Sequence, residues 1–479
     1  MSGTIRPTLS FIQVNTRWRQ TAFGDSSLWT VINLEETNAP LLDMILAHSG
    51  NRLLTVFINR DDLDRCAKLW SAVDRIEELH YTTNLQKLVP LLSSLGPALN
   101  LKVLELAPEQ MDVEVEEYSI PLVNLPVIFS GSLPSLRNLS LTNAAVGSAG
   151  VFKDLISFDC RVLLPQPISP VYVLEVFRES PSIESIRMNC YCNIPPGFNP
   201  PPVTLGSLKH CTLNGPGTTS LIRFMIVPPS ATVSLSKPYG GSIFSNFEDL
   251  SIIPGLHILD QVSAASFCIS DSGVRLRAGN DRGGYLDSGL DGLPQNMLIH
   301  FIRSFFECGR TSPGFKTTKE LVFDVTRTGV IPVGESTRFA LDALGLIRTL
   351  PDIEKMKLLG VPPLELFFIL EYLSGAQDVQ LPCRKLKRLY IESTHIRTPT
   401  PLLAEVEKIL KERKRSGASL QAFAVRVESE TLLPETEYQA FLTSLESLVG
   451  GRVRLESGLS TDAEMIRSRR RRFEGEDDV

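Results

Sequence analysis

The stretch "LKVLEL", residues 101–106, is one copy of a six-residue pattern that recurs along the chain. Apolar residues occupy its first, fourth and sixth positions. In a β-strand, the fourth and sixth side chains share one face and the fifth points away from them. The first apolar residue leads the chain into the strand. The pattern therefore predicts a short strand with one buried face and one exposed face.

The same pattern, in stronger or weaker form, is found at ten places. The copies are "IEELHY" (76–81), "LKVLEL" (101–106), "LRNLSL" (136–141), "IESIRM" (183–188), "LKHCTL" (208–213), "FEDLSI" (247–252), "TKELVF" (318–323), "IEKMKL" (353–358), "LKRLYI" (386–391) and "LQAFAV" (420–425). Successive copies begin 25 to 47 residues apart, except for one interval of 71. Since 71 is close to twice 35, we expect one further unit in that interval, in "ASFCIS" (265–270) or "VRLRAG" (274–279).

Segments between the copies have the spacing of amphipathic helices. Residues 83–96, 362–375 and 398–417 carry apolar residues in helical register, and the last two begin near proline and end at glycine. A short unit of strand, loop and helix cannot bury its apolar face alone, so neighbouring units must stack. The fold class predicted is α/β, as an irregular leucine-rich-repeat-like solenoid with parallel strands on one face and helices on the other. The alternative is an ordinary α/β domain in which these strings occur by chance.

Composition limits the class of protein. The 479 residues carry a formal net charge of −6, which argues against nucleic-acid binding. The N-terminus does not resemble a secretory signal, and no apolar run reaches the ~18 residues of a membrane-spanning helix. The eight cysteines are scattered and are expected to be buried free thiols. We therefore expect an intracellular protein, cytoplasmic and/or nuclear, that does not bind membranes.

Motifs for catalysis are missing from the sequence. No phosphate-binding loop, H-E-x-x-H helix or G-x-S-x-G elbow is found. Asp281, Asp287 and Asp291 lie within the glycine-rich stretch 271–294 but lack the spacing of a calcium-binding loop. This stretch and the proline-rich stretch 194–245 are interpreted as surface loops or irregular units. No catalytic residue, metal site or cofactor is predicted, and the protein is not expected to be an enzyme.

The exposed strand positions are the candidates for binding. A curved stack of strands presents a concave face on which outward residues contact a partner protein. The candidates are Lys102, Glu105, Arg137, Ser140, Lys209, Thr212, Lys387 and Tyr390. The alternative for each of them is a plain solvated strand face.

The N-terminal stretch differs from the repeats. Residues 8–23 are predicted as a helix, with Phe11, Val14 and Trp18 on one face, and residues 28–34 as a strand that contains Trp29. Trp18 and Trp29 could cap the open end of the solenoid, whose first strand otherwise has an exposed edge.

The same stretch, "LSFIQVNTRWRQTAFGDSSLWTVINL" (9–34), resembles the second half of an F-box and its junction, as in the large F-box families of mushroom-forming fungi. The residues that carry the resemblance are Val14, Trp18, Arg19, Ala22, Ser27, Leu28 and Trp29. In this stretch Asn15 replaces the family's usual cysteine. The following "APLLDMILAHSGNRLLTVFI" (39–58) resembles the next segment of that family, with His48 where arginine is usual. The "LP-x-E" segment that opens an F-box is not found, so the box is expected to lack its front half.

The resemblance implies a substrate receptor of an SCF-type cullin–RING ubiquitin ligase. Its F-box would bind a Skp-type adaptor, and its repeats would bind the protein to be ubiquitylated. The adaptor-binding candidates are Phe11, Val14, Trp18 and Trp29. The alternative is a repeat scaffold for protein–protein interaction with no link to ubiquitin, because the F-box is incomplete. The parts expected are a partial F-box-like cap and junction (1–36), the solenoid (37–457) and a disordered charged tail (458–479).

Overall fold

The computed structural model divides the chain into two compact units. Unit 1 comprises residues 1–246 and 253–257, and unit 2 comprises residues 247–252 and 258–479. The division falls inside the segment that the sequence predicts as one solenoid. The structure describes residues 15–59, 63–82, 85–108, 122–162, 166–215, 217–238, 256–270, 273–291, 310, 313–325, 333–375, 381–396, 399–429 and 433–459.

Unit 1 contains a sheet whose described strands all run parallel. In spatial order the strands are β1 (Val31–Asn33), β2 (Leu54–Ile58), β3 (Ile76–Thr82), β4 (Val103–Ala107), β6 (Asn138–Thr142), β8 (Ser157–Arg161), β10 (Ser185–Asn189), β13 (His210–Asn214) and β15 (Thr232–Pro238). Each strand pairs with the strand that follows it in this series. Since parallel neighbours need a crossover connection, the chain leaves the sheet after each strand and begins the next strand at the same end of the sheet.

Strand register follows the six-residue pattern. The fourth position, Leu104, pairs with Leu79 on one side and Leu139 on the other, and the sixth positions pair in the same way. These leucines are at most 1 % exposed. Burying one leucine side chain stabilises a fold by roughly 1.5–3 kcal/mol. The pattern therefore sets the register, because a slip of one residue would turn each buried row to solvent.

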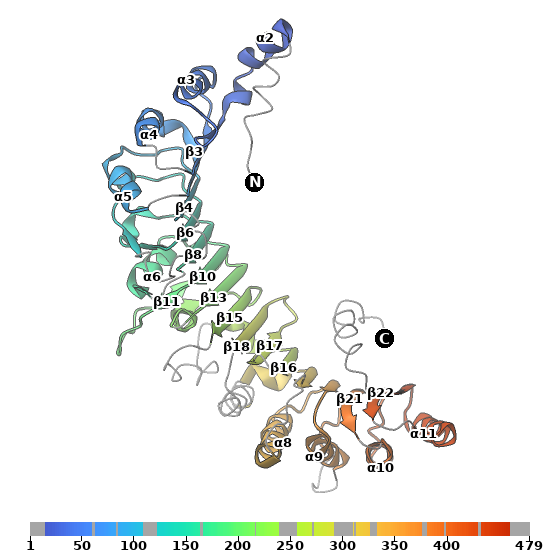
Figure 1. Ribbon diagram of the computed structural model, residues 1–479. Helices are drawn as coiled ribbons and strands as arrows, with labels where there is room; N and C mark the ends of the chain where they lie inside the picture. Colours follow the sequence, from blue (N-terminus) through green and yellow to red (C-terminus); the bar gives the residue numbers. More distant parts are fainter. Residues whose placement is uncertain are drawn as a thin grey trace. The chain divides into compact units, whose positions relative to one another are not determined.

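Helices and short strands complete the units of unit 1. The helices are α2 (Thr16–Gly24), α3 (Ala39–His48), α4 (Leu63–Trp70), α5 (Leu85–Ser94) and α6 (Pro170–Arg178). In Figure 1, α3, α4, α5 and α6 lie along one face of the sheet. Short parallel pairs form between β5 (Val123–Leu125) and β7 (Ala144–Val146), β9 (Pro167–Ile168) and β11 (Tyr191–Cys192), and β12 (Val203–Thr204) and β14 (Met225–Ile226).

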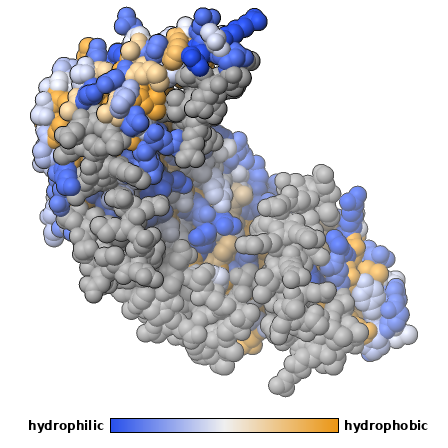
Figure 2. All heavy atoms as spheres, turned by 45° about the horizontal axis from the view of Figure 1, so that its top comes forward, coloured by the Kyte–Doolittle hydropathy of each residue, from blue (hydrophilic) through white to orange (hydrophobic). Residues whose placement is uncertain are grey.

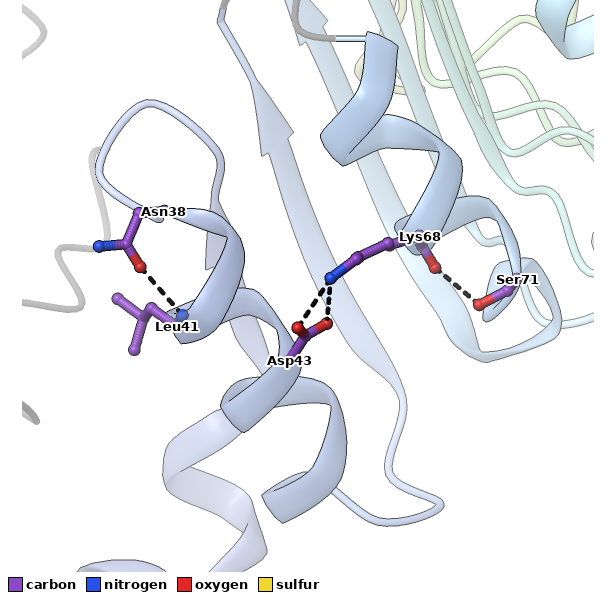
Figure 3. A network of polar contacts seen from close by, with 5 residues as sticks. All are labelled: Asn38, Leu41, Asp43, Lys68 and Ser71. Carbon is purple, nitrogen blue, oxygen red and sulfur yellow. Dashed lines mark hydrogen bonds and ion pairs between the residues drawn. The ribbon is translucent and has the colours of Figure 1, made fainter.

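The first units show how local sequence fixes these helices. Asn38 caps α3, because its side-chain oxygen accepts a hydrogen bond of 3.0 Å from the Leu41 amide. One helix further, Lys68 of α4 donates to both carboxylate oxygens of Asp43 on α3, at 2.7 and 2.9 Å (Figure 3). Both side chains are about half exposed, so this pair orients neighbouring helices and adds little stability.

Trp29 lies in a short 3-10 helix and not in the predicted strand. Trp29 ends the 3-10 helix η1 (Ser26–Trp29), directly before β1. The Asp25 carboxylate accepts a 2.9 Å hydrogen bond from the Ser27 amide and starts this turn. The strand predicted for residues 28–34 is therefore limited to Val31–Asn33.

Unit 2 contains a mixed sheet. In spatial order its strands are β18 (Tyr285–Asp291), β17 (Gly273–Gly279), β16 (Ala264–Ser270), β19 (Glu320–Val325), β20 (Lys355–Leu359), β21 (Arg388–Ile396), β22 (Ala422–Ser429) and β23 (Arg452–Leu459). Six of these strands, β16, β19, β20, β21, β22 and β23, run parallel to one another. β17 runs antiparallel to both β16 and β18. The glycine-rich stretch predicted as a surface loop is therefore mostly this hairpin.

The helices of unit 2 lie beside one another along the sheet. They are α8 (Val333–Arg348), α9 (Pro363–Ser374), α10 (Thr400–Arg415) and α11 (Glu435–Leu448). Gly375 ends α9 with φ +73, as the sequence predicts. Fully buried Arg413 of α10 donates to the carbonyl oxygens of Leu373, Pro382 and Cys383 at 2.8–3.4 Å. A cation at the C-terminus of α9 satisfies carbonyl groups that the helix leaves unpaired.

Short 3-10 helices lie in several of the connections. Besides η1, they are η2 (Val73–Arg75), η3 (Phe129–Gly131), η4 (Ala149–Val151), η5 (Thr219–Phe224), η7 (His257–Gln261) and η8 (Pro313–Thr317).

The strands predicted from the six-residue pattern are confirmed wherever the structure describes them. Every copy of the six-residue pattern forms a strand except "FEDLSI" (247–252), which lies outside the described residues. The extra unit expected in the long interval is β16, which carries "ASFCIS" and pairs in parallel with β19, while "VRLRAG" forms the antiparallel β17. A further copy, "LISFDC" (155–160), forms β8 and was not predicted. The architecture is α/β, with large, mostly parallel sheets and helices.

Candidate protein-interaction faces

One face of the unit 1 sheet carries mostly polar side chains that are exposed or half-buried. We call these outward residues the unit 1 strand face. They are Thr55, Phe57, Glu78, His80, Val103, Glu105, Asn138, Ser140, Ser157, Asp159, Ser185, Arg187, His210, Thr212, Thr232 and Ser234. Register places residues of equal rank side by side, so that Glu105, Ser140 and Asp159 are consecutive members of one row.

His80 joins three strands of this face. Its ring stacks on Phe57 of β2 with centroids 4.6 Å apart, and its Nδ1 lies 2.7 Å from the Glu105 carboxylate of β4. Nε2 lies 3.7 Å from Glu78 on its own strand. The hydrogen bond to Glu105 raises the pKa of His80, although partial burial opposes it. The same bond lowers the pKa of Glu105.

The rest of the unit 1 strand face is built mainly from short side chains, with Arg187 and His210 as the longer ones. From β6 onward it carries mainly serine, threonine and asparagine, with Asp159 bound to Arg161 on the same strand at 2.6 Å. Hydroxyl and amide groups both donate and accept hydrogen bonds. Short polar groups in rows suit contact with a surface or peptide of another protein, and their small size lets a partner approach the strands.

Unit 2 presents a second such surface with a different charge. We call its outward residues the unit 2 strand face. They are Tyr285, Asp287, Arg275, Arg277, Ser266, Cys268, Glu320, Val322, Lys355, Lys357, Arg388, Tyr390, Glu392, Ala422, Ala424, Arg426, Arg452, Arg454 and Glu456. Glu320 pairs with Lys355 at 3.0 Å and with Lys357 at 3.8 Å. In Figure 2 the coloured atoms are mostly hydrophilic, with smaller hydrophobic areas between them.

The predicted binding candidates are divided between two places. Glu105, Ser140, Thr212 and Tyr390 lie on the strand faces. Burial raises the pKa of Tyr390, whose hydroxyl donates to Glu392 at 3.2 Å. The four basic candidates instead lie one residue before their strands, at the edge of the sheet where strands begin. They are Lys102, Arg137, Lys209 and Lys387.

Three of these basic residues link consecutive units. Lys102 pairs with Glu77 at 2.6 Å, Lys209 with Glu184 at 2.7 Å and Lys387 with Glu354 at 2.7 Å. In each pair, both residues occupy the second position of the six-residue pattern. Sequence reasoning missed this relation, although "IE" in one copy and "LK" in the next signal it. Arg137 donates to nearby carbonyl oxygens, including that of Leu136 at 2.9 Å.

The adaptor-binding candidates are only partly described. Phe11 and Val14 lie outside the described residues, and so does the Trp18 side chain, although its backbone belongs to α2. Trp29 is 1 % exposed, and its indole N–H donates to the Ala22 carbonyl at 2.6 Å. Its ring packs against Phe23 of α2 and His48 of α3. Trp29 thus holds α2 against α3, as a terminal cap would.

Groups suited to catalysis or metal binding do not converge in the described residues. No cluster of three or more His, Cys, Asp or Glu side chains is placed to hold a metal ion there. The described cysteines, Cys160, Cys190, Cys192, Cys211, Cys268 and Cys383, are free thiols, and all but Cys268 are buried. Burial raises the pKa of Cys211 to about 12, so this thiol stays protonated and unreactive.

The fold and the two faces define a class, an α/β protein with large, mostly parallel sheets and polar outward rows. Comparisons with protein-family models, curated proteins and solved structures found no match to this chain. Among the helices that are described, none combines the length and apolar character needed to cross a membrane.

Proposed function

We propose that the chain is an irregular leucine-rich-repeat-like solenoid that recognises a protein partner without catalysis. The observation that carries this proposal is the register of consecutive six-residue copies. Their apolar positions pair in buried rows, and their outward positions pair in rows of differing side chains. Such rows form a binding surface whose specificity changes with the outward residues while the core stays the same.

The partner would be the substrate of an SCF-type ubiquitin ligase. This step is supported by the resemblance of residues 9–58 to the later part of an F-box and its junction. In this role, the N-terminal segment binds a Skp-type adaptor and the strand faces bind the protein to be ubiquitylated. The second candidate function is a scaffold with no link to ubiquitin. The burial of Trp29 favours it, because this adaptor candidate is engaged inside the N-terminal cap.

Partner capture from cell extract can be compared between two matched variants. Ser140→Arg adds a long cation to the unit 1 strand face, whereas Ser94→Arg adds the same cation at an exposed position of α5. We expect proteins captured by the wild type to be lost with Ser140→Arg and kept with Ser94→Arg. Equal capture by all three chains, with equal thermal unfolding, contradicts recognition by this face.

The ubiquitin link is tested with a purified Skp-type adaptor. We expect the full chain to bind it, and Trp18→Ala to weaken binding by about tenfold, as for a residue central to an interface. Gln20→Ala, on the opposite face of the predicted helix, is the matched control and should leave affinity unchanged. Failure of the wild type to bind the adaptor rejects the ligase role and leaves the scaffold.

A further inference from the structure

The C-terminal strands of the unit 2 strand face carry a distinct arrangement of cations. In register, Arg388 of β21, Ala422 of β22 and Arg452 of β23 are consecutive neighbours. Two residues further along, Tyr390, Ala424 and Arg454 form the next outward row. Strands are about 4.8 Å apart, so Arg388 and Arg452 flank the alanine at a mutual Cα distance of about 9.6 Å. We call these six residues the arginine frame.

Two cations of the arginine frame remain available to a ligand. Arg388 and Arg452 are exposed, and neither forms an ion pair within the described residues. Arg454 pairs with Glu456 at 2.6 Å but its side chain is 57 % exposed. No acidic residue occupies either row of the arginine frame. Guanidinium groups bind carboxylates in bidentate geometry, so two unpaired arginines on either side of one residue form a receptor for an anion.

The two alanines give the centre of the arginine frame its shortest side chains. Ala422 and Ala424 are successive outward residues of β22, and both are flanked by long side chains on the neighbouring strands. A methyl group is much shorter than the side chains of the flanking arginines and Tyr390. We call the strip formed by the two alanines along β22 the floor of the arginine frame.

We propose that the arginine frame binds an extended, acidic segment of the partner protein. This inference rests on the proposed function, and it names the chemistry of the partner at the second strand face. An extended chain repeats every two residues, at about 6.6–6.8 Å, which equals the spacing between the Ala422 and Ala424 rows. Carboxylates at alternate positions of the segment therefore meet first Arg388 and Arg452, and then Arg454.

The experiment measures fluorescence anisotropy of a labelled peptide, Gly-Glu-Ala-Glu-Ala-Glu-Gly, against the full chain. We expect the glutamine version of the peptide to bind at least about tenfold more weakly than the glutamate version. Arg388→Gln with Arg452→Gln should weaken the glutamate peptide by a similar factor. Arg384→Gln with Arg415→Gln removes the same charge at exposed positions elsewhere in unit 2 and should stay within about twofold of wild type.

A second variant separates shape from charge. Ala424→Leu fills the floor without changing charge, and its outward position leaves the core untouched. We expect it also to weaken the glutamate peptide about tenfold, with thermal unfolding unchanged. Binding of the peptide within twofold of wild type by the double arginine variant overturns the inference. Tighter binding of a single-stranded oligonucleotide through the same arginines overturns it in favour of a nucleic-acid site.

Failure here is distinct from failure of the proposed function. Partner capture that is sensitive to Ser140→Arg concerns unit 1 and does not involve the arginine frame. If that sensitivity is observed and the glutamate peptide does not bind, recognition by the unit 1 strand face stands and the acidic-segment inference is rejected.

Discussion

His80 is the residue through which three neighbouring strands of unit 1 interact on their outward side. Its ring packs on Phe57, and its nitrogen atoms approach Glu105 and Glu78. The pKa of His80 is raised above 6.5 in the folded chain, and the pKa of Glu105 is lowered below 4.5. The imidazolium–carboxylate pair is therefore stabilising at pH values between these two figures.

This pair predicts a pH dependence of stability. A raised histidine pKa contributes stability that is fully present below pH 6.5 and is lost as pH rises through the folded pKa. We expect the free energy of unfolding to fall more between pH 6 and pH 8 in the wild type than in His80→Gln. Urea denaturation at the two pH values measures this. His210→Gln, which alters an exposed histidine on the same face, should behave like the wild type. Equal pH dependence in His80→Gln and the wild type contradicts the assignment.

Trp29 gives a second prediction at the residue scale. Trp29→Ala should lower the free energy of unfolding by about 3–5 kcal/mol, because it leaves a cavity beside Phe23 and His48. Trp29→Phe should lower it by about 1–3 kcal/mol, since the Ala22 carbonyl then lacks its donor. Leu28→Ala changes the exposed neighbour and is the control. Denaturation of Trp29→Ala at wild-type denaturant concentration would show that Trp29 does not cap unit 1.

The six-residue copy is the element on which the fold depends. Leu139→Ala in β6 should lower the free energy of unfolding by about 2–5 kcal/mol, because Leu139 is buried between Leu104 and Phe158. Ser140→Ala, one residue along, should change it by at most about 0.5 kcal/mol. Chemical denaturation of the two variants measures the difference. Equal effects would mean that the alternation of buried and outward positions is wrong.

Sequence patterns predicted these strands because burial alone determines them. Leu136, Leu139 and Leu141 reveal β6 without any long-range information. The copy that forms β8 was missed although its apolar residues, Leu155, Phe158 and Cys160, have the same spacing. The hairpin of β17 and β18 was missed because its glycines suggested a loop, whereas pairing with β16 stabilises it as strand.

The candidate site was predictable only in part. Alternation correctly assigned Glu105 and Tyr390 to outward strand positions. It could not show that Lys102, Lys209 and Lys387 reach back to a glutamate of the preceding unit, because that contact depends on which units are neighbours. The arginine frame likewise depends on register among β21, β22 and β23, which brings together residues 388, 422 and 452.

At the scale of the whole molecule, charge is distributed unevenly. The chain carries a net charge of −6, yet every charged residue in the two rows of the arginine frame is a cation. An acidic partner is therefore repelled by the chain as a whole and attracted at one place. We expect affinity for the glutamate peptide to fall as salt rises from 50 to 200 mM, by about the same factor for wild type and for the Arg384→Gln, Arg415→Gln control. Salt-independent binding would contradict a charge-based site.

The central claim is that, within each unit, the described six-residue copies stand side by side as parallel strands. Nitroxide labels on introduced non-natural residues test it in unit 1, by electron–electron distance measurement from Val103 to Ser185, His210 and Thr232. These residues share one outward row and are three, four and five strands apart. At about 4.8 Å per strand, we expect backbone separations of about 14, 19 and 24 Å. Separations that do not increase in this order would contradict the account.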